Sequence, residues 1–315
     1  MKRTLSIILA LVLIVSLCAC TTDNTDKEQG KLKIIATIFP QYDFARTIGK
    51  DLCDVSMLIS PGTESHSFEP TTSDIMELAD CDIFIYTGGE SDSWIDAMLA
   101  NINNPNMTVI SLMDCVDLLE AEDDHNHSDS HDHTDSHDHG KMDEHVWTSP
   151  VNAIKISEAI CKAMCDKDPE NADIYRQNFN SYKTELTALD DSFREIAENS
   201  VRKTLVFGDR FPLRYFAQEY GLEYSAAFSG CSDDTEASAS TVAQLIDKVK
   251  AEQIPVVLKI ELSSDSIATT ICNETGAKLM TFYSCHNISK DDFLAGETYL
   301  SLMQKNAETL KLALN

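Results

Sequence analysis

Two series of short apolar, β-branched runs shape this 315-residue chain. The runs alternate with segments whose apolar residues have helical spacing, such as 41–48, 74–79 and 240–252. The runs are 33–38, 54–59, 82–86 and 108–110 in the first series, and 204–207, 223–227, 256–260 and 278–282 in the second. Nearly continuous apolar strands that alternate with helices are typical of parallel sheets covered on both faces. The pattern predicts an α/β fold of two lobes, each with a mainly parallel sheet flanked by helices.

The segment between the two series predicts one long, rigid helix. It is expected to begin at Asp168-Pro169, and neither Gly nor Pro interrupts 170–199. A helix of about 30 residues reaches roughly 45 Å, which is more than one lobe needs. We therefore expect an N-terminal lobe (32–168), a helix that joins the lobes (169–199) and a C-terminal lobe (200–315). Residues 291–314 are expected to form one amphipathic helix that packs on a lobe.

The N-terminus is typical of an export signal. Lys2 and Arg3 precede the apolar run 5–17, which is too short to span a bilayer comfortably. The sequence Leu17-Cys18-Ala19-Cys20 follows, and it resembles the lipobox of bacterial lipoproteins. We predict a signal peptide at 1–19 and a flexible tether at 20–31 that starts with lipidated Cys20. The protein would be exported and lipid-anchored on the outer face of the bacterial cytoplasmic membrane.

The charge balance is strongly acidic. The chain has 25 Lys and Arg against 52 Asp and Glu, a formal net charge of −27. Such an excess repels phosphate backbones, so it argues against a nucleic-acid-binding function.

Histidines and carboxylates alternate within the acidic segment 120–144. Neutral imidazole is a common ligand of transition metals, and neighbouring carboxylates attract cations. The tract is therefore predicted to bind zinc-like ions weakly at several sites, and a solvated loop without a metal role is the alternative. Its histidines are His125, His127, His131, His133, His137 and His139.

Three further histidines, His66, His145 and His286, each lie beside an expected strand end or loop. His66 follows the second run, and His286 follows the last run of the second series. Ligands of doubly wound sheets collect outside the carboxyl ends of the strands, where these loops would lie.

Several motifs together resemble one protein family. They are the lipobox, P-G-x-x-x-H-x-F-E-P at 61–70, the acidic His-rich tract, D-E-H-V-W-x-S-P at 143–150 and the long central helix. This combination resembles the zinc and manganese solute-binding lipoproteins of ABC transporters, especially the zinc-uptake branch, over essentially the whole mature chain. The resemblance implies one metal site at the interface of two α/β lobes, with His66 and His145 as ligands from the N-terminal lobe.

The second lobe departs from the family pattern. Zinc-uptake relatives have a histidine after the first strand of this lobe, where the chain reads Gly208-Asp209-Arg210. Gly208 or Arg210 occupies the ligand position, depending on the alignment, and Asp209 is the plausible donor between them. The family's last ligand falls near His286. We expect His66, His145 and His286 to be three nitrogen ligands, with Asp209 or a water completing a tetrahedron and Glu64 in reserve.

The metal and the function follow from this ligand set. Three imidazoles suit Zn(II) better than Mn(II), which would favour carboxylate oxygens. We expect a monomeric, non-enzymatic component of an importer that captures zinc and delivers it to an ABC permease and, through it, its ATPase. One alternative is a zinc-dependent hydrolase, because three histidines and a water can also form a catalytic site. The other is a surface lipoprotein for metal buffering or adhesion.

Overall fold

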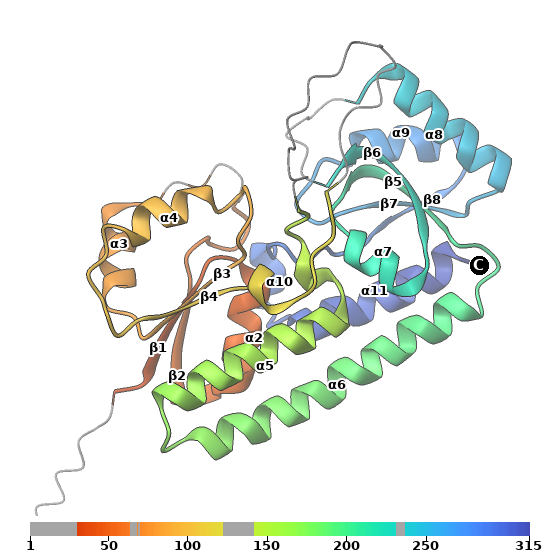
Figure 1. Cartoon of the computed structure of the whole chain (residues 1–315). Coiled ribbons are helices and arrows are strands. Elements are labelled where there is room, and N and C mark those ends of the chain that lie inside the picture. The colour runs from red at the N-terminus through yellow and green to blue at the C-terminus, as the bar shows by residue number, and fades with distance from the viewer. Residues whose placement is uncertain (1–29, 64–67, 69, 122–141, 231–236) are drawn as a thin grey trace, which may run out of the picture. The chain divides into compact units, whose positions relative to one another are not determined.

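Two parallel sheets of four strands each organise the computed structural model, which describes residues 30–63, 68, 70–121, 142–230 and 237–315 (Figure 1). The first sheet has the order β2-β1-β3-β4 and the second has the equivalent order β6-β5-β7-β8. The strands are β1 (Leu32–Ala36), β2 (Cys53–Met57), β3 (Ile83–Tyr86), β4 (Thr108–Ser111), β5 (Thr204–Phe211), β6 (Glu223–Ser229), β7 (Val256–Lys259) and β8 (Lys278–Thr281). The expected fold class of two helix-flanked, parallel lobes is confirmed.

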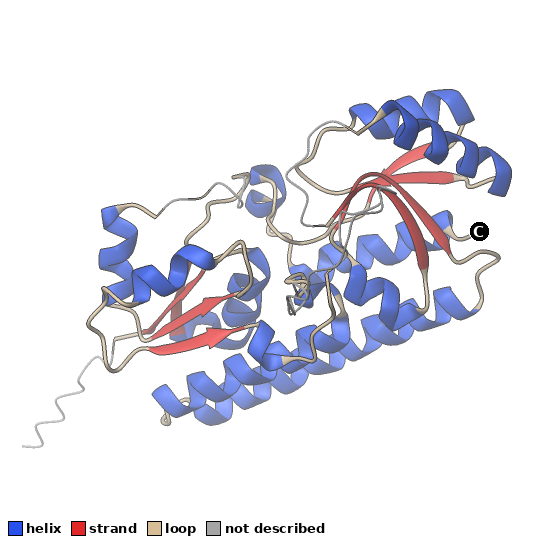
Figure 2. Cartoon of the chain, turned by 45° about the horizontal axis from the view of Figure 1, so that its top comes forward, coloured by secondary structure: helices blue, strands red, loops and turns tan. Residues whose placement is uncertain are grey.

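Helices cover both faces of each sheet, as Figure 2 shows. The described helices are α2 (Phe39–Gly49), α3 (Thr72–Ala79), α4 (Ser93–Leu99), α5 (Pro150–Lys167), α6 (Ala172–Glu198), α7 (Arg214–Tyr220), α8 (Ala239–Glu252), α9 (Ser266–Thr275), α10 (Lys290–Leu294) and α11 (Tyr299–Ala313). Short 3-10 turns lie at Lys50–Leu52, Met113–Cys115 and Val146–Thr148. Of the described helices, none is long and apolar enough to cross a membrane.

The two faces of each sheet have separate apolar partners. In β1, Ile34 and Ala36 pack with α2 and α5, whereas Ile35 on the opposite face packs with α3 and α4. In β5, Val206 packs against α8 and α9 on one face. Successive side chains of a strand point to opposite faces, so strands that are apolar at every position need helices on both sides.

One continuous core joins the inner faces of the two sheets. It contains buried residues of β1 and β3 from the first sheet, of β5 and β7 from the second, and of the helices between them. Helix α6 contacts α5 and α2 along one part and α11 and α7 along another. Its 27 residues extend over about 40 Å, so it runs along both sheets in Figure 1. Residues Leu32–Asn315 accordingly form one compact unit.

Three details of the helices differ from the sequence expectations. Asp168 ends α5 instead of starting the long helix, and α6 begins at Ala172. In the turn between these helices, the backbone N–H of Asn171 donates to Asp168 Oδ1. The expected single helix at 291–314 is two helices, because Gly296 has φ +80° and Thr298 caps α11. Helix α4 was not anticipated.

Candidate metal centre

A cavity of about 210 Å³ lies beyond the carboxyl ends of β5 and β7. Strand β5 pairs with β6 on one side and β7 on the other, so the chain leaves these two neighbouring strands in opposite directions. Such a switch point is where ligands bind in open α/β sheets. The lining residues are Gly62, Thr63, His145, Arg210, Pro212, Gly230, Ile260, Glu261, Leu262, Ser263, Ser284, His286 and Asn287. They come from loops of both sheets.

His145 is buried and held by a carboxylate. The Nδ1 atom lies 3.0 Å from Asp143 Oδ1, which also accepts the backbone N–H of His145 at 2.8 Å. Burial raises the pKa of Asp143, but the hydrogen bonds and charge of His145 outweigh this effect and lower the pKa overall. Because an ionised carboxylate can only accept, Nδ1 carries the ring proton and Nε2 is the basic nitrogen. This is the tautomer that a metal ligand requires at Nε2.

His286 sits in the loop after β8, next to Cys285 with its left-handed φ of 58°. Glu261 shapes this loop, because its carboxylate accepts both the backbone N–H and the hydroxyl of Ser284 at 2.7 Å. Burial raises the pKa of Glu261, and the bonds from Ser284 offset only part of that rise, so the pKa is about 6. The loop conformation that presents His286 is therefore tied to the end of β7.

Trp147 connects the loops that carry the two histidines. Its Nε1 donates to Ser284 O at 2.9 Å, and its ring centroid lies 5.5 Å from that of His145 and 5.2 Å from that of His286. The centroids of the two imidazoles are 5.8 Å apart and the rings are nearly perpendicular. Two imidazoles on one tetrahedral zinc would have centroids roughly 5 Å apart, given a Zn–N distance of about 2.0–2.1 Å. The structure thus brings His145 and His286 close to the spacing of shared ligands.

His66 and Glu64 lie outside the described residues, as do lipidation candidate Cys20 and all six histidines of the acidic tract. Thr63, three positions before His66, lines the cavity, and Asn287 Nδ2 donates to its carbonyl at 2.8 Å. A bridge between Glu120 and Met142 joins the two ends of the acidic tract. Among the described residues, no group of three or more His, Cys, Asp or Glu side chains is placed to hold a metal ion.

Asp209 has a structural role in this arrangement. Its Oδ1 accepts the backbone N–H of Arg210 at 2.8 Å, while Oδ2 accepts the backbone N–H of Ile260 at 2.9 Å and the hydroxyl of Ser263. The carboxylate thereby fastens the loop after β7 to β5. Asp209 is not among the described residues that line the cavity, so its place as the expected fourth donor stays a prediction.

The structure shows which residue of the segment 208–210, where the sequence departs from the family pattern, faces the cavity. An added Cβ at Gly208 would lie 2.4 Å from Ala268 Cα, so this position faces α9. The β5–β6 register shifts between Phe207 and Arg210, and Arg210 lines the cavity. A bulge of this kind re-aims side chains. Of the three residues at 208–210, Arg210 is the one that reaches the site.

Sequence reasoning missed the parts played by Trp147 and Ser284. Trp147 belongs to the D-E-H-V-W motif, but only tertiary packing shows that it joins the loop of His145 to the loop of His286. Nothing in the sequence around Ser284 indicates that its hydroxyl donates a hydrogen bond to Glu261.

Known proteins share both sequence and fold with this chain. The family model "Zinc-uptake complex component A periplasmic" matches residues 34–313. The high-affinity zinc uptake system protein ZnuA of Bacillus subtilis is 33% identical over 310 residues, which cover 98% of this chain and 96% of that protein. The zinc-binding lipoprotein AdcA of Streptococcus pneumoniae is 31% identical over 98% of this chain, which spans only 60% of AdcA.

A solved structure supports the same assignment. The crystal structure of the Zn(II)-bound ZnuA-like domain of Streptococcus pneumoniae AdcA matches with a TM-score of 0.75 and 30% identity. The match covers 90% of this chain and 99% of that domain. Together with the two parallel sheets, the long α6 and the paired histidines, these similarities show that the chain belongs to the family of the periplasmic component A of zinc-uptake complexes.

Proposed function

We propose that this protein is the extracytoplasmic zinc-binding component of a metal ABC importer. The observation that carries the proposal is the pair His145 and His286, which face one cavity from loops of the two sheets. The carboxylate of Asp143 orients His145, as outer-sphere carboxylates orient metal-bound histidines. The family membership and the zinc-binding names of the relatives agree with this function.

The proposed ligands of the transported zinc are His66, His145 and His286. Thr63 lines the cavity and lies three positions before His66 in the sequence, which supports His66 as the ligand from this loop. Asp209 already accepts three hydrogen bonds, which favours a water or another small ligand over Asp209 at the fourth position. Three neutral nitrogen ligands favour Zn(II) over Mn(II).

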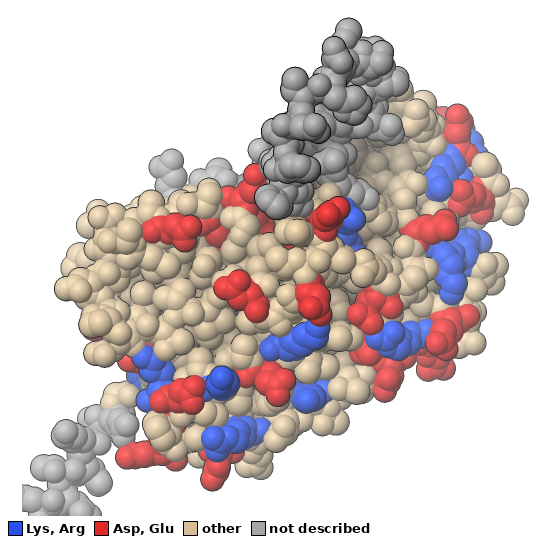
Figure 3. Space-filling view, in the orientation of Figure 1, with Lys and Arg blue, Asp and Glu red and all other residues tan. Residues whose placement is uncertain are grey.

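The remaining parts of the proposal concern capture and delivery. The six histidines of the acidic tract would collect dilute zinc ahead of the cavity, and the loaded monomer would dock on a membrane permease that is driven by its ATPase. Cys20 would carry the lipid anchor on the outer face of the cytoplasmic membrane. On the face in Figure 3, acidic and basic side chains are interspersed and form no broad basic patch. This face is therefore poorly suited to bind a polyanion.

Calorimetric titration of zinc and manganese tests the proposal. The chain from Thr21, which contains the whole folded unit, is compared with His286→Ala, His66→Ala and a variant that lacks 123–139. We expect one tight zinc event that survives loop deletion and is lost in both alanine variants, with His131→Ala as the matched control in the tract. Binding should weaken in acid, because protons compete for the imidazole nitrogens.

Two results would contradict the proposed function. Tight zinc binding that disappears with residues 123–139 would place the site in the acidic tract. A clear preference for manganese over zinc would contradict the nitrogen ligand set.

A further inference from the structure

Arg210 gives the cavity a fixed positive charge beside the two histidines. It is partly buried and lines the same cavity as His145 and His286. The backbone N–H of Arg210 donates to Asp209, but no hydrogen bond or ion pair joins its guanidinium to another described residue. A guanidinium is always charged and presents a planar fork of donors. Such a group in a cavity is suited to an anionic ligand.

The charges around the cavity leave a metal ion poorly balanced. His145 and His286 bind a metal as neutral imidazoles, and the carboxylate oxygens of Glu261 are bonded to Ser284. Asp143 lies behind His145 and Asp209 is fastened to the loop after β7. Zinc and Arg210 together carry three positive charges, whereas Glu261 is the one carboxylate among the described residues that line the cavity, so positive charge is in excess there. Like charges in a partly water-excluded site repel more strongly than in bulk water, so a compensating anion would stabilise both.

The size of the cavity also exceeds the need of a bare ion. Its volume is about 210 Å³, whereas one water occupies about 30 Å³ of the liquid. After a zinc ion binds between the imidazoles, the space toward Arg210 can hold a small organic anion. Carboxylate oxygens are good zinc ligands, and the guanidinium fork matches a carboxylate with two parallel hydrogen bonds.

We propose that this site takes up zinc together with a small carboxylate anion, which bridges the open coordination position of the metal and the guanidinium of Arg210. The inference rests on the proposed function, because it assumes that zinc binds between His145 and His286. It makes Arg210 a specificity-determining residue of the cavity. A carboxylate is favoured over phosphate because the planar fork of Arg210 pairs with one carboxylate group, and a second carboxylate of the same small anion is then left for the metal.

Equilibrium dialysis with radiolabelled malonate tests the inference. The chain from Thr21 is dialysed with malonate, with and without one equivalent of zinc, while bound zinc is measured separately. We expect the wild type to retain about one malonate per chain with zinc and little without it, since coupling between two ligands is reciprocal. Arg210→Gln should bind malonate about tenfold more weakly or worse while it still binds zinc.

Three further arms separate charge, geometry and folding. Arg210→Lys keeps the charge but loses the fork, so its malonate affinity should lie between those of Arg210→Gln and the wild type. Arg176→Gln removes an arginine that pairs with Asp173 on the surface, and it should behave as the wild type does. Circular dichroism and the zinc stoichiometry check that each variant is folded.

The outcomes distinguish the inference from the function on which it rests. If the wild type binds zinc but retains no more malonate than Arg210→Gln does, the anion site is wrong and the zinc site stands. If radiolabelled phosphate is retained in place of malonate, the carboxylate assignment is wrong. If zinc itself is not bound, both proposals fail.

Discussion

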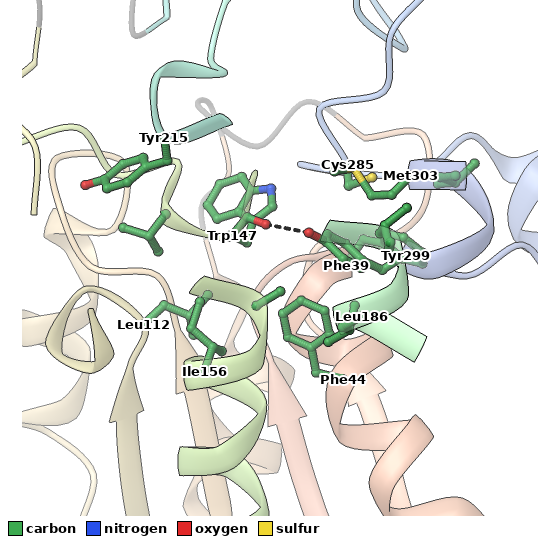
Figure 4. Close-up of a cluster of buried hydrophobic side chains, with 14 of the residues drawn as sticks. Phe39, Phe44, Leu112, Trp147, Ile156, Leu186, Tyr215, Cys285, Tyr299 and Met303 are labelled. Carbon is green, nitrogen blue, oxygen red and sulfur yellow. Dashed lines mark hydrogen bonds between the residues drawn. The ribbon is translucent and has the colours of Figure 1, made fainter. Parts of the chain in front are cut away.

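The buried hydroxyl of Tyr299 connects the C-terminal helix α11 to the turn that follows His145. Tyr299 is the first residue of α11, and its hydroxyl donates to the carbonyl of Trp147 at 2.8 Å (Figure 4). Its backbone N–H donates to Asp43 Oδ2, also at 2.8 Å. Burial, together with the nearby Cys285 and Asp43, raises the pKa of Tyr299 well above its usual value. The hydroxyl is therefore a donor at every pH at which the protein would be assayed.

Replacing Tyr299 by Phe removes this bond and little else. The ring is fully buried and makes an edge contact with Phe44 at a centroid distance of 4.9 Å, which phenylalanine can keep. The change leaves the bond to Trp147 unmade in a site away from water. We expect Tyr299→Phe to lower the free energy of unfolding by about 1–3 kcal/mol, which is the cost of a lost buried hydrogen bond.

Urea unfolding of the metal-free chain, followed by far-ultraviolet circular dichroism, measures this change. Tyr42→Phe is a matched control, because Tyr42 is partly exposed and its hydroxyl has no hydrogen bond to another described residue. The control should stay within about 0.5 kcal/mol of the wild type, as surface substitutions generally do. The reasoning is refuted if Tyr299→Phe also stays within that range, or if the control is destabilised equally.

Three other changes probe the cavity and its support. Burial raises the pKa of Glu261 from 4.5 to about 6, so the stability that this group contributes is present below about pH 4.5 and lost as the pH rises through 6. Between pH 4 and 7, the free energy of unfolding of the metal-free wild type should fall by about 1 kcal/mol relative to that of Glu261→Gln. This is less than the full pKa shift implies, because the side chain of Glu261 is partly exposed. Equal changes of unfolding free energy with pH in the two proteins would contradict this prediction. Asp143→Asn should weaken zinc binding about 10- to 100-fold in calorimetry, because it removes the carboxylate that orients His145, and an unchanged affinity would show that the carboxylate is dispensable. Gly208→Ala should destabilise the fold by about 1–3 kcal/mol in urea, since the new methyl group meets the backbone of Ala268; an unchanged midpoint would show that α9 moves aside freely.

Local patterns in the sequence determined most of the secondary structure. The eight expected strands all occur, because apolar β-branched runs between helical segments can be satisfied only in covered parallel sheets. The long helix was predictable from a segment without Gly or Pro whose apolar residues recur at helical spacing. Five of these residues are buried in α6: Phe179, Tyr182, Leu186, Leu189 and Phe193. Its start was misjudged because Asp168 bonds to Asn171 within the turn between α5 and α6 instead of capping a helix at Pro169.

The sequence predicted some features of the candidate site and not others. His145 and His286 were identifiable as residues beside strand ends, and the motif around His145 marked that loop. Their proximity depends on Trp147 and on the core that joins the two sheets. Whether Gly208, Asp209 or Arg210 reaches the cavity depended on the register shift in β5, which no pattern in the sequence announces.

The sequence alone therefore determined the parallel strands, the long helix and the candidate histidines, because hydrophobic periodicity and residue chemistry are local properties of the chain. The tertiary structure decided that His145 and His286 share one cavity, that Asp209 fastens a loop and that Arg210 faces the site. These outcomes follow from the packing of two sheets on one core and from the hydrogen bonds of their loops, which join residues that are distant in the chain.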